Sequence, residues 1–150
     1  MDEVRVKVKL TNSFDEGLAR RGKISESEIR RYEADALVDT GAVSSVVPSY
    51  VMKQLGVLSI GTRVAEYADG RKDTVDLTEP IVFDIIGRIT TENAMVLGDE
   101  VIIGQTVLEV IDMFVDCVNR KLVPNPAHPD QPVVKIKKKK SSKATLGLTK

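Results

Sequence analysis

The chain of 150 residues consists largely of short apolar or alternating runs that end at glycine or at Asp-Gly. Residues 4–10 alternate strictly between apolar and charged side chains, which is the pattern of a strand with one buried face. Asp69-Gly70 stands between two strand-like segments, 63–68 and 72–77, and Asp-Gly in such a place is a strong signal of a β-hairpin. These features predict a mostly β fold.

The other segments complete one domain with two short helices. Strands are expected where β-branched and apolar residues cluster, and helices where Pro or Gly precedes an amphipathic run. Further strands are predicted at 33–39, 44–47, 81–86, 89–96, 101–103, 114–118 and 121–123, and helices at 48–55 and 105–113. Residues 11–32 are polar and rich in turn formers, so we expect mostly loop there.

The end of the domain is marked by proline and lysine. Four of the six prolines lie between residues 124 and 132. We therefore expect the domain to comprise residues 1–126. Residues 127–150 are expected to form a disordered tail that is rich in Pro and Lys, because a block of like charge repels itself.

The formal net charge of zero hides an asymmetry. Residues 1–132 carry a net charge of −7, and the last 18 residues carry +7. An acidic body does not form a nucleic-acid platform, so any contact with nucleic acid is expected to be weak and to use the lysine-rich tail. A polyanion-binding protein that uses this tail is one functional hypothesis.

Several classes of protein are disfavoured by simple counts. One Cys permits no internal disulfide, and one His permits no His cluster for a metal. No apolar run approaches the roughly 20 residues that span a bilayer, and the N-terminus lacks the features of a signal peptide. We expect a soluble cytoplasmic protein without metal or cofactor.

The main candidate for chemistry is Asp39-Thr40-Gly41-Ala42, directly after the apolar strand. The strand would bring Asp39 to the edge of the core. Gly41 permits a tight turn that brings backbone N–H groups near the carboxylate, and Thr40 offers a hydroxyl that can fix the loop. Taken alone, Asp-Thr-Gly is also an ordinary turn sequence.

The order of three motifs makes the interpretation more specific. Asp39-Thr40-Gly41-Ala42 is followed by the turn Ala68-Asp69-Gly70 and by Ile102-Ile103-Gly104 before a helix. In this order and spacing the motifs resemble the retropepsin-like family of retroviral-type aspartic proteases, over roughly residues 30–126. The pattern is similar to small cellular and bacterial members of that family.

The resemblance implies a small closed β-barrel-like fold that is active as a homodimer. Only one Asp-Thr-Gly occurs here, so a two-carboxylate site needs two chains, and a two-fold axis would place both Asp39 residues face to face. The pair would share one proton. One Asp39 would activate water against a peptide bond of the substrate, and the other would hydrogen-bond to the carbonyl oxygen.

The resemblance also assigns roles to the neighbouring residues. Thr40 would brace the two loops across the dimer, and Gly41 and Ala42 would shape the loop. The turn Ala68, Asp69 and Gly70 would be the tip of a mobile flap that closes over a peptide. The strand Ile102, Ile103 and Gly104 would thread behind the catalytic loop.

Besides polyanion binding, two alternatives stay open at this stage. A non-catalytic retropepsin-like module for peptide binding or dimerisation is one, since this chain replaces the viral C-terminal strand by a Pro-rich and Lys-rich tail. A nucleophilic pair of Cys117 and His128 is the other. Cys117 lies in an apolar run that predicts a buried thiol, and His128 lies in a segment that predicts a mobile linker.

Overall fold

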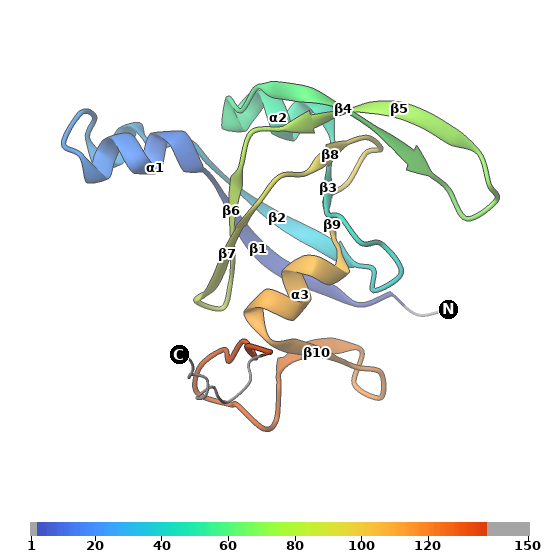
Figure 1. Cartoon of the computed structure of the whole chain (residues 1–150). Coiled ribbons are helices and arrows are strands. Elements are labelled where there is room, and N and C mark those ends of the chain that lie inside the picture. Colours follow the sequence, from blue (N-terminus) through green and yellow to red (C-terminus); the bar gives the residue numbers. More distant parts are fainter. Residues whose placement is uncertain (1–2, 138–150) are drawn as a thin grey trace, which may run out of the picture.

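The computed structural model describes residues 3–137, and its main feature is one strongly curled sheet (Figure 1). The sheet has nine strands in the order β4-β5-β8-β3-β9-β2-β1-β6-β7. Their bounds are β1 Arg5–Asn12, β2 Arg31–Val38, β3 Val46–Val47, β4 Ser59–Glu66, β5 Lys72–Thr78, β6 Ile81–Ile85, β7 Arg88–Glu92, β8 Met95–Val96 and β9 Ile102–Ile103. The predicted mostly β, barrel-like fold is confirmed. It takes the form of a half-barrel, because no ladder joins β4 to β7 within the described range and the curled sheet keeps two edges.

The strand pairing follows from the hydrophobic pattern. β1 pairs antiparallel with β2 along its length, from Arg5 opposite Leu37 to Thr11 opposite Arg31. The alternation of residues 4–10 puts Val8 and Leu10 in the core, where Leu10 has no exposed surface. β6, which pairs with the end of β1, contributes the fully buried Phe83. The predicted half-buried strand is confirmed.

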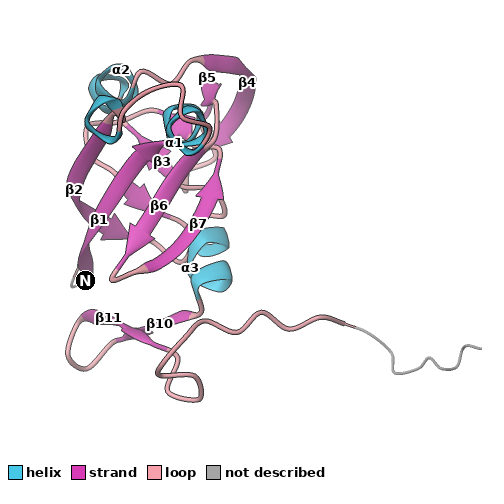
Figure 2. Cartoon of the chain, turned by 90° about the vertical axis from the view of Figure 1, so that its left-hand side faces the viewer, coloured by secondary structure: helices cyan, strands magenta, loops and turns pink. Residues whose placement is uncertain are grey.

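In the described part of the chain, three α-helices lie at the ends of the sheet: α1 Ser13–Arg20, α2 Ser49–Leu55 and α3 Gln105–Ile111. Figure 2 shows α1 and α2 at one end and α3 at the other. α2 and α3 are the two predicted helices, and α2 ends as expected at Gly56, whose φ is 69°. α1 falls in the segment predicted to be mostly loop.

The missed helix has local and tertiary causes. Asn12 caps α1 by accepting a hydrogen bond from the amide of Asp15. The buried Asp15 carboxylate then receives two hydrogen bonds from the Arg30 guanidinium, at 2.8 and 2.9 Å. These bonds hold the pKa of Asp15 below its ordinary value. α1 therefore depends on Arg30, 15 residues from Asp15, and the polar sequence of the helix itself does not predict this contact.

The chain leaves the main sheet after α3. β10 Met113–Asp116 and β11 Lys121–Pro124 form a separate two-stranded sheet below the rest of the molecule (Figure 2). β10 ends at Asp116 because its carboxylate accepts hydrogen bonds from the amides of Val118 and Asn119, which fold the chain into a turn. The two predicted strands are present, but they do not close the main sheet, because they pair only with each other within the described range.

The segment after β11 differs from the expected free tail. Between residues 125 and 133 the chain makes several hydrogen bonds to α3 and β7, through Asp112 and Arg88. Residues 138–150 of the predicted tail lie outside the described residues.

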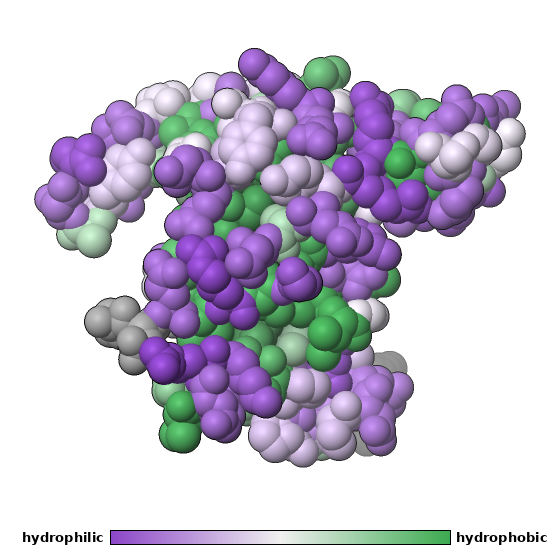
Figure 3. Space-filling model, turned by 180° about the vertical axis from the view of Figure 1, so that it is seen from behind, coloured by the Kyte–Doolittle hydropathy of each residue, from purple (hydrophilic) through white to green (hydrophobic). Residues whose placement is uncertain are grey.

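Figure 3 shows apolar side chains gathered across the middle of the rear face, between more polar upper and lower ends.

Candidate active site

Asp39 follows the last residue of β2, where the chain passes around the end of the buried strand β9. β2 pairs in parallel with β9, Leu37 opposite Ile102 and Val38 opposite Ile103. On its other side β9 pairs antiparallel with β3. The amide of Asp39 donates to the carbonyl of Ile103 at 2.9 Å. The structure thus places Ile102, Ile103 and Gly104 beside the Asp39 loop.

The turn after Asp39 holds its carboxylate in place. The Gly41 amide donates to Asp39 Oδ1 at 2.9 Å, and the Ala42 amide donates to the Asp39 carbonyl at 3.1 Å. Asp39, Thr40 and Gly41 are exposed, and Ala42 is half-buried. The sequence therefore builds a fixed carboxylate that faces outward, with a backbone N–H beside it.

The first residues of α3 tie down the far side of this loop. The Gln105 amide donates to the Ala42 carbonyl at 2.7 Å, and Thr106 Oγ1 donates to the Val43 carbonyl at 2.9 Å. The Gly104 amide donates to Oγ of the buried Ser45 at 2.9 Å. These bonds join segments about 60 residues apart in the chain.

Gly104 is required by this close approach. A Cβ atom at Gly104 would lie 2.7 Å from the carbonyl carbon and oxygen of Ser44 and 2.9 Å from the carbonyl oxygen of Ala42. Those atoms belong to the backbone of the Asp39 loop and cannot rotate away. The glycine therefore lets β9 and α3 support the loop from directly behind.

Replacement of Thr106 by valine is expected to loosen the loop without a change of shape. The variant removes the hydroxyl bond to Val43 and keeps the weaker backbone bond. A bond of this kind contributes about 0.5–1.5 kcal/mol. We expect a loss of that size in chemical denaturation and faster amide exchange at residues 40–43. Thr91→Val, at an exposed threonine of β7, is the control, and equal exchange in the two variants would contradict the assigned role.

The predicted flap is the hairpin of β4 and β5. All three residues of its tip, Ala68, Asp69 and Gly70, are exposed, and Gly70 has a φ of 89°, which suits glycine. The hairpin projects from the body above the β2–β3 loop in the view of Figure 1. Backbone bonds between Tyr67 and Arg71 close the turn, at 2.8 Å from the Tyr67 amide to the Arg71 carbonyl.

Side chains stiffen the tip of this hairpin. The Arg71 guanidinium lies 4.7 Å from the centre of the Tyr67 ring, and the Tyr67 hydroxyl donates to Asp73 at 2.9 Å. Arg71 also donates to the Asp69 carboxylate at 2.8 Å, which lowers the pKa of Asp69 from its ordinary value. Any movement of the flap would therefore occur with its tip intact.

The alternative pair of Cys117 and His128 is not assembled. Cys117 is exposed, so the prediction of a buried thiol is wrong, because the strand ends at Asp116 and the chain turns outward. His128 Nδ1 instead lies 2.6 Å from Asp112 Oδ2. His128 is therefore fixed against α3 rather than placed in a free linker.

Three residues that support the loop were not singled out from the sequence: Val43, Ser45 and Thr106. Their roles depend on contacts between distant segments and leave no motif in the sequence. Within residues 3–137 no group of three or more His, Cys, Asp or Glu side chains could hold a metal ion. In the same range no helix is long and apolar enough to span a membrane.

Comparison with known proteins gives similarities of structure only. No family model matches the chain, and no curated protein does. One solved structure that resembles it is EIAV protease in complex with the inhibitor HBY-793, at 17% sequence identity and a TM-score of 0.49. That match covers 71% of this chain and 86% of the viral chain. Simian foamy virus (mac) protease also resembles it, at 14% sequence identity and a TM-score of 0.44, and that match covers 69% of this chain and 90% of the viral chain.

A foamy viral protease-reverse transcriptase in complex with an RNA/DNA hybrid also resembles this chain. It has 16% identity and a TM-score of 0.45, and the match covers 69% of this chain and 11% of that protein. All three are viral proteases or contain one. At these identities and TM-scores the likeness carries no argument about function, which has to be inferred from the Asp39 loop.

Proposed function

We propose that this chain is an aspartic endopeptidase that acts as a homodimer. The observation that carries the proposal is the Asp39 carboxylate itself. It is exposed, it is oriented by the Gly41 amide, and it stands on a loop that β9 and α3 support from behind. A carboxylate held this firmly at the surface is suited to react rather than to stabilise the fold.

One chain supplies only half of the chemistry. Peptide hydrolysis of this kind needs one carboxylate to accept a proton and one to donate a proton. A second copy related by a two-fold axis supplies the same residue again. Two carboxylates in contact cannot both be ionised at ordinary cost, so the pair shares one proton.

The proposed reaction follows from that shared proton. The ionised Asp39 removes a proton from a water molecule, and the water oxygen forms a bond to the carbonyl carbon of the peptide. The protonated Asp39 of the other copy transfers its proton to the carbonyl oxygen. The tetrahedral intermediate then collapses and the C–N bond breaks. The leaving nitrogen takes the proton that the first Asp39 removed from water, and the other Asp39 regains a proton from a hydroxyl of the intermediate. No metal and no covalent enzyme intermediate enters these steps.

The surface beside the loop fits the proposed contact between two copies. Val43 follows the Asp39-Thr40-Gly41-Ala42 turn directly, and its side chain is 73% exposed. An apolar side chain this exposed gains free energy when a partner covers it. A second copy that brings its own Asp39 to this loop would cover Val43 as well.

The test is cleavage of a diverse peptide mixture from mildly acidic to neutral pH, measured over a wide range of enzyme concentration. We expect products, and we expect the rate per chain to fall once sizing shows that dimers dissociate. A rate per chain that stays constant down to a concentration at which only monomers exist would contradict the shared site. A dimeric protein that produces no cleavage would favour a peptide-binding module instead.

A further inference from the structure

α3 connects two parts of the molecule that are far apart in sequence. Its first residues, Gln105 and Thr106, hold the carbonyls of Ala42 and Val43 in the Asp39 loop. Its other end is Asp112, which has a φ of 60° and is only 9% exposed. α3 has seven residues, so it is two turns long. One face of this short helix is buried in the core through Val107, Leu108 and Ile111. We expect a displacement at one end to reach the other.

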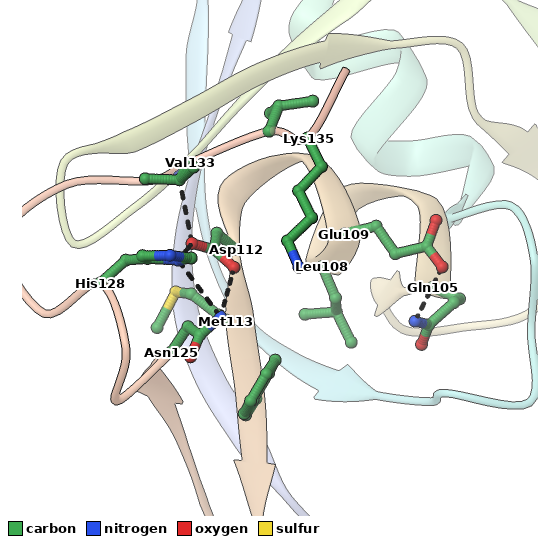
Figure 4. A pocket seen from close by; sticks show the side chains of 11 residues that line it. Gln105, Leu108, Glu109, Asp112, Met113, Asn125, His128, Val133 and Lys135 are labelled. Carbon is green, nitrogen blue, oxygen red and sulfur yellow. Dashed lines mark hydrogen bonds and ion pairs between the residues drawn. The ribbon is translucent and has the colours of Figure 1, made fainter. Parts of the chain in front are cut away.

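The carboxylate of Asp112 forms hydrogen bonds with the segment that follows β11. Asp112 Oδ1 accepts from Asn125 Nδ2 at 2.9 Å, and Oδ2 accepts from the Val133 amide at 3.0 Å. Oδ2 also lies 2.6 Å from His128 Nδ1 (Figure 4). Residues 125–133 thus form a strap that three bonds fasten to the buried Asp112 carboxylate, and the Asn125 amide also donates to the Asp112 carbonyl at 3.0 Å.

The buried Arg88 of β7 also binds both the end of α3 and the strap. Its Nη1 donates to the carbonyls of Ile111 and Asp112, at 3.1 and 2.9 Å, and so satisfies the carbonyls at the end of α3. Its Nη2 donates to the carbonyl of His128 at 2.8 Å. Arg88 therefore bonds to the helix end and to the strap at once.

The strap does not pack closely along the whole helix. A cavity of about 440 Å³ lies between them, lined on the helix side by Gln105, Leu108 and Glu109 and on the other side by Val133 and Lys135 (Figure 4). Close packing does not fix the strap against this face of the helix. The bonds to Asp112 and Arg88 therefore hold the strap, and they add to the core packing of Leu108 and Ile111 in fixing the end of α3.

We propose that Asp112 is a positioning residue for the reaction at Asp39. Its carboxylate fixes the strap and the C-terminal end of α3, and α3 in turn sets the position of the Asp39 loop through Gln105 and Thr106. This inference rests on the proposed function, because the position of the loop matters for catalysis only if Asp39 reacts.

Asp112→Asn is the variant that isolates the carboxylate. Asparagine has the same shape and tolerates the left-handed backbone conformation of residue 112. It loses the charge that strengthens the bonds to Val133, His128 and Asn125. Asp116→Asn is the matched control, since Asp116 also accepts two backbone amides and a side-chain amide, in the nearby turn after β10.

We expect Asp112→Asn to raise amide exchange of Val133 by about tenfold, because it weakens charge-assisted hydrogen bonds. Exchange at Gln105 and Thr106 should rise as well, and kcat should fall by about three- to tenfold with KM nearly unchanged. Asp116→Asn should leave exchange at these three amides and the kinetic constants as in wild type. His128→Ala, which removes one bond of the strap, should show the same pattern more weakly.

Some results would overturn the proposal. Faster exchange at Val133 with wild-type exchange at Gln105 and Thr106 and wild-type kcat would show that the strap is only structural. Should Asp112→Asn not fold, the same comparison with His128→Ala decides. If wild-type protein cleaves no peptide, the proposed function fails, whereas exchange at Gln105 and Thr106 still shows whether Asp112 controls the loop.

Discussion

Replacement of Asp39 by alanine is expected to lower peptide cleavage by at least about 10³-fold. General acid and general base catalysis each contribute about 10²–10⁴-fold, and this substitution removes both from a symmetric pair. The fold should persist, because the Asp39 side chain is exposed and its bond to the Gly41 amide lies at the surface. We expect a change in unfolding free energy within about 0.5 kcal/mol.

The control for Asp39 is Asp35→Ala. Asp35 lies on the same strand, β2, and is also exposed. Both variants are purified in the same way and assayed on one peptide mixture. Cleavage that persists in Asp39→Ala at the level of Asp35→Ala would mean that another site or another protein cuts the peptides.

Replacement of Gly104 by alanine is expected to damage both stability and activity. The added Cβ would overlap the backbone of Ser44 and Ala42, at 2.7–2.9 Å. Overpacking of this kind costs about 1–3 kcal/mol, and here the loop that carries Asp39 has to move to relieve it. A displacement near 1 Å can reduce the rate about 10²-fold, so activity should fall far more than the loss of folded protein explains.

The control for Gly104 is Gly17→Ala. Gly17 lies in α1, and a Cβ atom there would meet only the ends of the Arg20 and Arg21 side chains, at 3.5–3.6 Å. Alanine inside a helix stabilises by about 0.5–1 kcal/mol relative to glycine. Wild-type activity in Gly104→Ala would show that β9 and α3 do not set the position of the Asp39 loop.

Elements with strong local signals could be predicted from the sequence. Residues 4–10 carry their own alternation, and Asp69-Gly70 defines its hairpin without help from the rest of the chain. α2 begins after Pro48 and ends at Gly56, where a left-handed residue closes the helix. In each case the residues that determine the element lie within about ten positions of one another, so the local sequence is enough to predict it.

Elements that depend on distant partners could not be predicted in this way. α1 is polar and contains Gly17, and the bond between Asp15 and Arg30 stabilises it from outside. The exposure of Cys117 follows from the place where β10 ends, which the apolar run around it does not reveal.

The residues of the candidate site also fall into those with a local sequence signal and those that depend on distant contacts. The Asp39 turn and the strand of Ile102 and Ile103 could be placed from motif order, because each has a recognisable sequence. The supports of the loop could not. Ser45 and Thr106 act through bonds across about 60 residues, and the choice of Ser or Thr at those positions has no local signature.

The most direct test of the central claim is the activity of a purified heterodimer with one wild-type chain and one Asp39→Ala chain. Two different affinity tags allow its isolation, and doubly tagged wild-type dimer is the reference. Because both carboxylates of the pair are needed for one reaction, we expect the heterodimer to be nearly as inactive as the Asp39→Ala homodimer. Half of the wild-type activity in the heterodimer would show that each chain works alone and would contradict the account.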